Sequence, residues 1–260
     1  FLVFFMLLGQ FDGEFVSTEP HTALVDINGE IGGDDGVTAD TLIGALNTAF
    51  DDKHTKAVVL RINSPGGSPV HAGLVFDEIK RLRVKHKQIP LYVVIDDICA
   101  SGGYYIAAAG DKIFVDKASL VGSIGVLMDG FGFTESMKKL GVERRLLTAG
   151  ENKGFLDPFS PKQANQETHA KLMLEEIHQQ FIQVVRKGRG NRLKETPDMF
   201  SGLVWSGARS IELGLADALG SLDTVARDVV KVEEIVDFTP QEGLADRLAR
   251  RIGTAVGDAM

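Results

Sequence analysis

Short apolar runs alternate with amphipathic segments along this 260-residue chain, and this alternation constrains the fold more than any other feature. The runs are rich in β-branched residues, as are strands buried on both faces. Between them apolar residues recur at helical spacing, and Thr38 is placed to cap the first helix. The sequence predicts an α/β protein with a mostly parallel sheet covered on both faces. We expect strands at 23–27, 57–62, 91–95, 112–115 and 142–147, and helices at 38–50, 70–82, 104–109 and 161–187.

Composition narrows the class of protein. The apolar fraction is 44%, which is typical of a globular chain, and the length suits one large domain. With 28 basic and 36 acidic residues the formal net charge is −8, which argues against a general nucleic-acid binder. Cys99 is the single cysteine, so an internal disulfide and a cysteine-based zinc site are both excluded.

The two ends of the chain differ in character from its middle. Residues 1–8 read FLVFFMLL, and a membrane span takes about 20 apolar residues. We therefore expect residues 1–20 to be the end of a membrane anchor plus a linker, the alternative being a buried first strand or helix. Residues 21–238 would form the main domain.

Residues 239–260 are expected to form an amphipathic helix. Packing on its own domain or on a neighbouring subunit is favoured over docking on a membrane surface. Its apolar side would carry Leu244, Leu248, Ile252 and Val256, with Arg247, Arg250 and Arg251 outside that side.

Two glycine-rich segments follow apolar strands and precede helices. They read NSPGGS at 63–68 and CASGGYY at 99–105, and both should open at the carboxyl edge of the sheet, where open α/β folds place ligands. A serine at such a turn exposes its hydroxyl, and nearby N–H groups can donate to a developing oxyanion. Ser101 is thus a candidate nucleophile, while ordinary turns remain the alternative. Neither segment matches a dinucleotide or nucleotide-triphosphate loop.

A nucleophilic Ser101 needs a base, because a free hydroxyl is weakly nucleophilic near neutral pH. None of the six histidines lies between Ser101 and Phe159. A lysine can serve when burial favours its neutral form. Lys153, in the segment GENKGF and crowded by Phe155 and Leu156, is the candidate; a surface lysine is the alternative.

Several motifs in order resemble the signal peptide peptidase A family, most closely its short SohB-like members. They are INSPGG at 62–67, ASGGYYIA at 100–107, DKIF at 111–114, VGSIGV at 121–126 and AGENKGFLDPFSP at 149–161. The segments RKGRGN at 186–191 and VWSGARSIELGLADALG at 204–220 also fit. The resemblance covers roughly residues 21–232.

The resemblance implies a Clp protease/crotonase-like fold of repeated ββα units and a membrane-associated serine endopeptidase with a Ser/Lys dyad. By this resemblance Ser101 is the nucleophile, Lys153 the general base and Ser123 the residue that orients the lysine. The N–H groups of Gly67 and Gly102 form the oxyanion hole. No metal or organic cofactor is implied.

The resemblance also implies a ring- or dome-like homo-oligomer in which Lys153 reaches the Ser101 of a neighbour. Substrates would be hydrophobic peptides such as remnant signal peptides, at the bacterial inner membrane with the extracytoplasmic side favoured. Side chains proposed for an apolar pocket are Phe131, Phe133, Phe155 and Leu156. Two alternatives share the fold: a crotonase-like acyl-CoA enzyme, and a catalytically inactive membrane scaffold.

Overall fold

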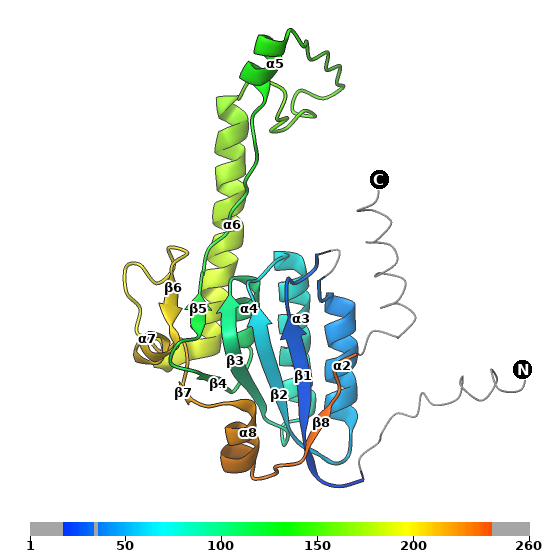
Figure 1. Cartoon of the computed structure of the whole chain (residues 1–260), viewed down its shortest axis with the longest axis vertical. Coiled ribbons are helices and arrows are strands. Elements are labelled where there is room, and N and C mark those ends of the chain that lie inside the picture. Colours follow the sequence, from blue (N-terminus) through cyan, green and yellow to red (C-terminus); the bar gives the residue numbers. More distant parts are fainter. Residues whose placement is uncertain (1–17, 34–35, 241–260) are drawn as a thin grey trace, which may run out of the picture.

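The computed structural model describes residues 18–33 and 36–240. Most of the expected anchor and linker at residues 1–20 and most of the expected C-terminal helix at 239–260 lie outside these ranges. Within them eight strands form one sheet in the order β6-β5-β3-β2-β1-β8, while β4 joins β3 to β7 (Figure 1). All pairings are parallel except that of β5 with β6. The predicted α/β class with a mostly parallel sheet is therefore confirmed.

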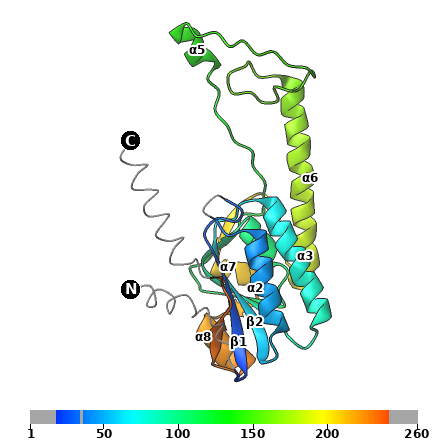
Figure 2. The same ribbon diagram turned by 90° about the vertical axis from the view of Figure 1, so that its right-hand side faces the viewer.

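Three consecutive strand–helix units build the centre of the domain. They comprise β1 (His21–Asn28), α2 (Ala39–Asp51), β2 (Thr55–Ser64), α3 (Pro69–Lys85), β3 (Leu91–Ala100) and α4 (Gly102–Ala107). The helices α2 and α3 lie side by side over one face of the sheet (Figure 2). Their apolar stripes are fully buried at Leu42, Leu46, Val75 and Ile79. Thr38 caps α2 by accepting a hydrogen bond from the Thr41 N–H, as predicted.

The opposite face of the sheet carries a smaller cluster. Val59, Val94 and Phe114 pack there against Val225, which belongs to a π-helical turn at Val225–Val230 that follows the short helix α8 (Leu222–Thr224). Burial on both faces explains why the central strands read as continuous apolar runs.

The predicted strand at 142–147 is wrong. These residues are extended without strand pairing among the described residues, and Leu147 is 95% exposed. An apolar run is not sufficient for a strand, because its backbone groups also need a partner strand. The remaining short strands escaped prediction because they have two or three residues, too few for a periodic signal. They are β5 (Leu120–Gly122), β6 (Val204–Ser206), β7 (Ala218–Leu219) and β8 (Ile235–Asp237), whereas β4 (Lys112–Val115) was predicted.

The strand β3 pairs with two strands in succession along one side. Its first half, from Tyr92 to Ile95, pairs with β4, and its last residues, from Ile98 to Ala100, pair with β5. The fork brings the end of β5 beside the end of β3. The consequence is that Gly122 lies opposite Ala100, directly before the turn that carries Ser101.

Residues 126–163 leave the sheet and form an arm, which runs beside α6 (Ala164–Arg189) and carries α5 (Thr134–Leu140) at its far end (Figure 1). The 26 residues of α6 correspond to a helix about 39 Å long. Its C-terminal half is anchored in the domain by buried Phe181, Ile182 and Val185. The arm is therefore a projection whose base, and not its tip, belongs to the core.

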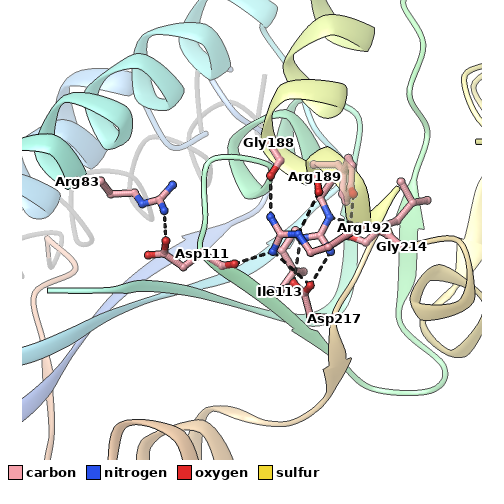
Figure 3. Close-up of polar contacts among 10 residues, drawn as sticks. Arg83, Asp111, Ile113, Gly188, Arg189, Arg192, Gly214 and Asp217 are labelled. Carbon is pink, nitrogen blue, oxygen red and sulfur yellow. Dashed lines mark hydrogen bonds and ion pairs between the residues drawn. The ribbon is translucent and has the colours of Figure 1, made fainter. Parts of the chain in front are cut away.

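An ion pair fixes the base of α6. Arg189, with a fully buried side chain, donates two hydrogen bonds of 2.9 Å to the carboxylate of Asp217 and one of 2.8 Å to the Gly214 carbonyl (Figure 3). Arg192 adds bonds to Asp217 and to the carbonyls of Asp111 and Gly188. Burial alone would raise the pKa of Asp217, but the hydrogen bonds and charge of Arg189 outweigh it and hold that pKa below its usual value.

Candidate active site

Ser101 occupies a strained turn between β3 and α4. Its backbone has φ 50° and ψ −121°, a conformation that residues other than glycine rarely adopt. Two hydrogen bonds maintain it: the Ser101 N–H donates to the Gly122 carbonyl at 2.8 Å, and the Tyr105 N–H donates to the Ser101 carbonyl at 2.9 Å. Within the described residues the half-buried Ser101 hydroxyl has no hydrogen-bond partner. Strain of this kind is typical of functional positions.

The glycine segment after β2 packs directly against this turn. A β-carbon on Gly66 would lie 2.7 Å from the Ser101 β-carbon, and one on Gly102 would lie 3.4 Å from the Gly67 nitrogen. Gly66 and Gly67 have φ values of +109° and +141°, so side chains are excluded there by both conformation and space. The Gly67 and Gly102 N–H groups donate no hydrogen bond to any described residue. Two free donors thus lie next to each other beside Ser101.

Ser123 also belongs to this neighbourhood. It follows Gly122, whose carbonyl accepts from Ser101, and it too has a positive φ, of 49°. Its N–H donates to the Leu203 carbonyl at 2.8 Å. The tertiary structure thus brings together four of the five residues proposed for the site: Ser101, Ser123, Gly67 and Gly102.

Lys153 lies elsewhere in the chain. It sits exposed in the arm, in a turn closed by its own N–H and the Gly150 carbonyl. The buried Gln166, in the first turns of α6, holds this region: its Oε1 accepts from the Leu156 N–H at 3.0 Å and its Nε2 faces the Asn152 oxygen at 3.5 Å. Gln166 therefore ties the Lys153 turn to the N-terminal end of α6, and this end of the helix projects away from the sheet (Figure 1).

His178 gives the scale of this separation. Its Nε2 is 3.2 Å from the carbonyl of Ile124, the residue after Ser123, so His178 marks where α6 passes the serine cluster. From His178 to Gln166 the helix rises by about 18 Å, whereas a lysine side chain spans only a few ångströms. Within one chain the Lys153 amine does not reach Ser101.

Sequence reasoning missed the positions of His178 and Gln166. Both are polar residues of a polar helix, and neither was assigned a role from the sequence. Gln166 lies four residues before the buried Ala170, and this spacing on one helix face was the available signal. The Nδ1 of His71, in α3, accepts a hydrogen bond from the Ala39 N–H at 2.9 Å and is therefore occupied.

The arm contains an apolar cavity of about 460 Å³ between its loop and the first half of α6. Phe131 and Leu156, two of the four side chains proposed for a pocket, line it together with Met128 and Leu174. Phe133 instead stacks on Phe159, and Phe155 packs edge-on against His169. The cavity thus belongs to the same end of the arm as Lys153.

The described part of the chain holds neither a candidate metal site nor a helix that could span a membrane. No group of three or more His, Cys, Asp or Glu side chains there is arranged to hold a metal ion. None of the helices that the structure describes combines the length and apolarity needed to cross a bilayer.

The geometry defines an α/β protein with two glycine-rich turns that pack together at the carboxyl ends of parallel strands. One of these turns presents a serine. The chain belongs to peptidase family S49, whose family model matches residues 83–236, more than half of the sequence. The match includes Ser101, Ser123 and Lys153, while Gly67 precedes it. The parallel-rich sheet agrees with the ClpP/crotonase-like fold of this family.

The similar proteins include some named as proteases and others named as an antiporter. The chain is 30% identical over 194 residues to "Serine protease SPPA, chloroplastic" of Arabidopsis thaliana, covering 72% of this chain and 27% of that one. It is 31% identical over 192 residues to "Probable protease SohB" of Haemophilus influenzae, covering 74% and 52%. A Brucella abortus protein named "Na(+)/H(+) antiporter NhaA" is 46% identical over 218 residues, which are 82% of this chain and 29% of that protein. The chain thus spans less than a third of the Brucella protein.

Proposed function

We propose that this chain is the catalytic part of a serine endopeptidase. Ser101 attacks the peptide carbonyl, and the N–H groups of Gly67 and Gly102 stabilise the oxyanion. Lys153 takes the hydroxyl proton and passes it to the leaving amine, Ser123 orients the lysine, and water then hydrolyses the acyl-enzyme. The observation that carries the proposal is the strained Ser101 turn packed against two glycine N–H groups that lack acceptors.

The general base comes from a second copy of the chain. The arm holds Lys153 too far from the serine cluster of its own subunit, as the rise of about 18 Å between His178 and Gln166 indicates. The surface of the arm also suits association, because it exposes several large apolar side chains, among them Leu127, Phe131 and Leu147 at 80%, 79% and 95%. We therefore propose a ring- or dome-like homo-oligomer in which each arm supplies Lys153 to the Ser101 of a neighbour.

Mixing two inactive variants tests the shared site. Ser101→Ala and Lys153→Ala should each abolish hydrolysis of a fluorogenic apolar peptide. When the two are unfolded together and refolded as a mixture, activity should return, because some neighbours then combine an intact serine with an intact lysine. The matched control is Lys138→Ala, an exposed arm lysine in α5 whose loss should leave turnover unchanged.

Three outcomes would contradict parts of this account. Turnover by Lys153→Ala at the wild-type level would remove the lysine from the mechanism. Turnover by Ser101→Ala would remove the serine and redirect attention to acyl-CoA chemistry on the same fold. A mixture that assembles but stays inactive would place both dyad members in one subunit.

The proposed substrates are hydrophobic peptides, including remnant signal peptides, met at the face of a bacterial inner membrane through an N-terminal anchor, with the extracytoplasmic side favoured. The protease names of the SPPA and SohB relatives support peptide hydrolysis, and the apolar arm cavity supports apolar side chains. Peptides with Leu, Ala or Phe near the cleaved bond should be hydrolysed faster than acidic ones of equal length. The antiporter name belongs to a protein of which this chain covers 29%, and we assign no ion transport to the chain.

A further inference from the structure

A second and larger hollow lies at the β8 edge of the sheet, beside α2 and away from α6. It has a volume of about 1450 Å³ and runs between the outer side of α2 and the edge strand β8. No residue of the serine cluster lines it. This α2–β8 groove therefore has no part in the proposed catalytic site.

The walls of the groove suit a packed helix. Thr41, Gly44 and Thr48 form a smooth stripe of small residues along α2, and a β-carbon on Gly44 would meet nothing within 4 Å. The other wall offers half-buried Ile235, Val236 and Phe238. Because β8 pairs only with β1 among the described strands, its outer edge is unpaired. Proteins commonly cover such an edge with a helix or a loop.

The groove is also strongly acidic. Its rim includes Asp40, Glu234 and Asp237, all exposed, together with further carboxylates on α2. Asp51 has its own cations, Lys85 and His86, from outside the groove. No Lys, Arg or His is among the described residues that line it. An occupant that carries arginines beside an apolar face would match both the apolar wall at β8 and the acidic rim.

We propose that residues 241–260 of the same chain fill the α2–β8 groove as a helix. The described chain ends at Pro240, which itself lines the groove. Because β8 runs parallel to β1, the chain leaves at the end where α2 begins and can turn back along α2. In the sequence Leu244, Leu248 and Ile252 share one helical face.

Length and charge favour this occupant. A helix over 244–256 would be about 20 Å long, as α2 is. Arg247 and Arg251 are four residues apart and border the apolar face, which places them opposite the acidic rim. The other terminal segment, residues 1–17, also begins beside the groove, since Thr18 lines it. It contains no lysine or arginine, so it lacks the complementary charge.

A photo-cross-linking amino acid tests the proposal in the full chain. A benzophenone side chain introduced at Leu248 should, on irradiation, cross-link to residues of α2 and β8, as identified by mass spectrometry of the digest. An equal mixture of isotopically heavy and light chains distinguishes linkage within one chain from linkage between copies. The same probe at Arg250, which lies farther from the apolar face, is the positional control and should cross-link less to the groove.

Charge reversal adds a second measurement. Asp40→Lys combined with Asp237→Lys should lower the cross-linking yield roughly tenfold, since two to three ion pairs are lost and replaced by repulsion. Adding Arg247→Asp and Arg251→Asp should restore the yield. The control Asp77→Lys, on the exposed side of α3, should change nothing.

Each other result overturns the proposal. Heavy-to-light cross-links would assign the groove to the tail of a second copy. If Leu248 cross-linked only to other parts of the chain, or not to the groove at all, residues 241–260 would not be the occupant of the groove. Groove cross-links from a probe at Phe4, with none from Leu248, would assign it to the N-terminal segment. None of these results depends on peptidase activity.

Discussion

Gly66 faces Ser101 so closely that a β-carbon on the glycine would lie 2.7 Å from the β-carbon of the serine. The two residues belong to different strand–helix turns, and their contact allows the Gly67 and Gly102 N–H groups to become neighbours. The conformation of the Ser101 turn therefore depends on the glycine segment after β2 as well as on its own residues.

Gly66→Ala should reduce peptide hydrolysis by at least about tenfold and destabilise the fold by about 1–3 kcal/mol, because the new methyl group displaces Ser101 and φ is +109°. Turnover of the fluorogenic peptide and urea unfolding measure the two effects. Gly73→Ala is the matched control: it lies in α3 with open space around it and should stabilise by about 0.5–1 kcal/mol. Wild-type activity in Gly66→Ala would contradict the tight packing.

Gln166→Ala should lower turnover while leaving the melting temperature almost unchanged. Gln166 holds the Lys153 region through Leu156 and Asn152, yet it lies at the end of α6 outside the main core, so its loss frees the loop without opening the domain. Gln180→Ala, on the exposed side of the same helix, is the comparison and should keep full turnover. A variant that loses stability and activity in proportion would show that Gln166 acts on the fold as a whole.

Asp217→Asn should destabilise the domain by about 3 kcal/mol, because Arg189 is left buried with its charge uncompensated. Urea unfolding at neutral pH gives this difference. The control Asp228→Asn removes the partner of an exposed pair with Arg227 and should have little effect.

The same pair predicts a pH dependence. Since the folded state lowers the pKa of Asp217, its contribution is complete above the unfolded pKa of about 3.9 and is lost as the pH falls through the lower folded value. The gap in stability between wild type and Asp217→Asn should therefore narrow below about pH 4. A gap that stays constant through this range would contradict the assignment.

Cys99 should resist alkylation in the folded protein. It is fully buried beneath the Ser101 turn, and burial raises the pKa of its thiol well above the ordinary value. Iodoacetamide labelling, followed by mass spectrometry, should be slow in buffer and fast in urea, with the rate reporting opening of the β3–β5 region. Rapid labelling under native conditions would mean that this region opens far more easily than its packing implies.

The elements that depend on local residue pattern could be predicted without the structure. The apolar runs at 57–62 and 91–95 and the helical spacing over 38–50 and 70–82 predicted the central strands and helices, because burial on both sheet faces leaves a direct mark on residue order. The turns at 63–68 and 99–105 could be located from their glycines, because glycine is required where backbones approach closely. Family resemblance then supplied the roles of Ser101 and Lys153.

How these parts meet depends on pairings between segments that are far apart in the sequence. The fork of β3 between β4 and β5 sets Gly122 and Ser123 beside Ser101, and no local pattern encodes that pairing. The apolar run at 142–147 resembled a strand but lies on an arm, because strand formation depends on a neighbour elsewhere in the chain. The separation of Lys153 from Ser101 likewise follows from the length and anchoring of α6, and this separation is why we propose a site shared between two copies.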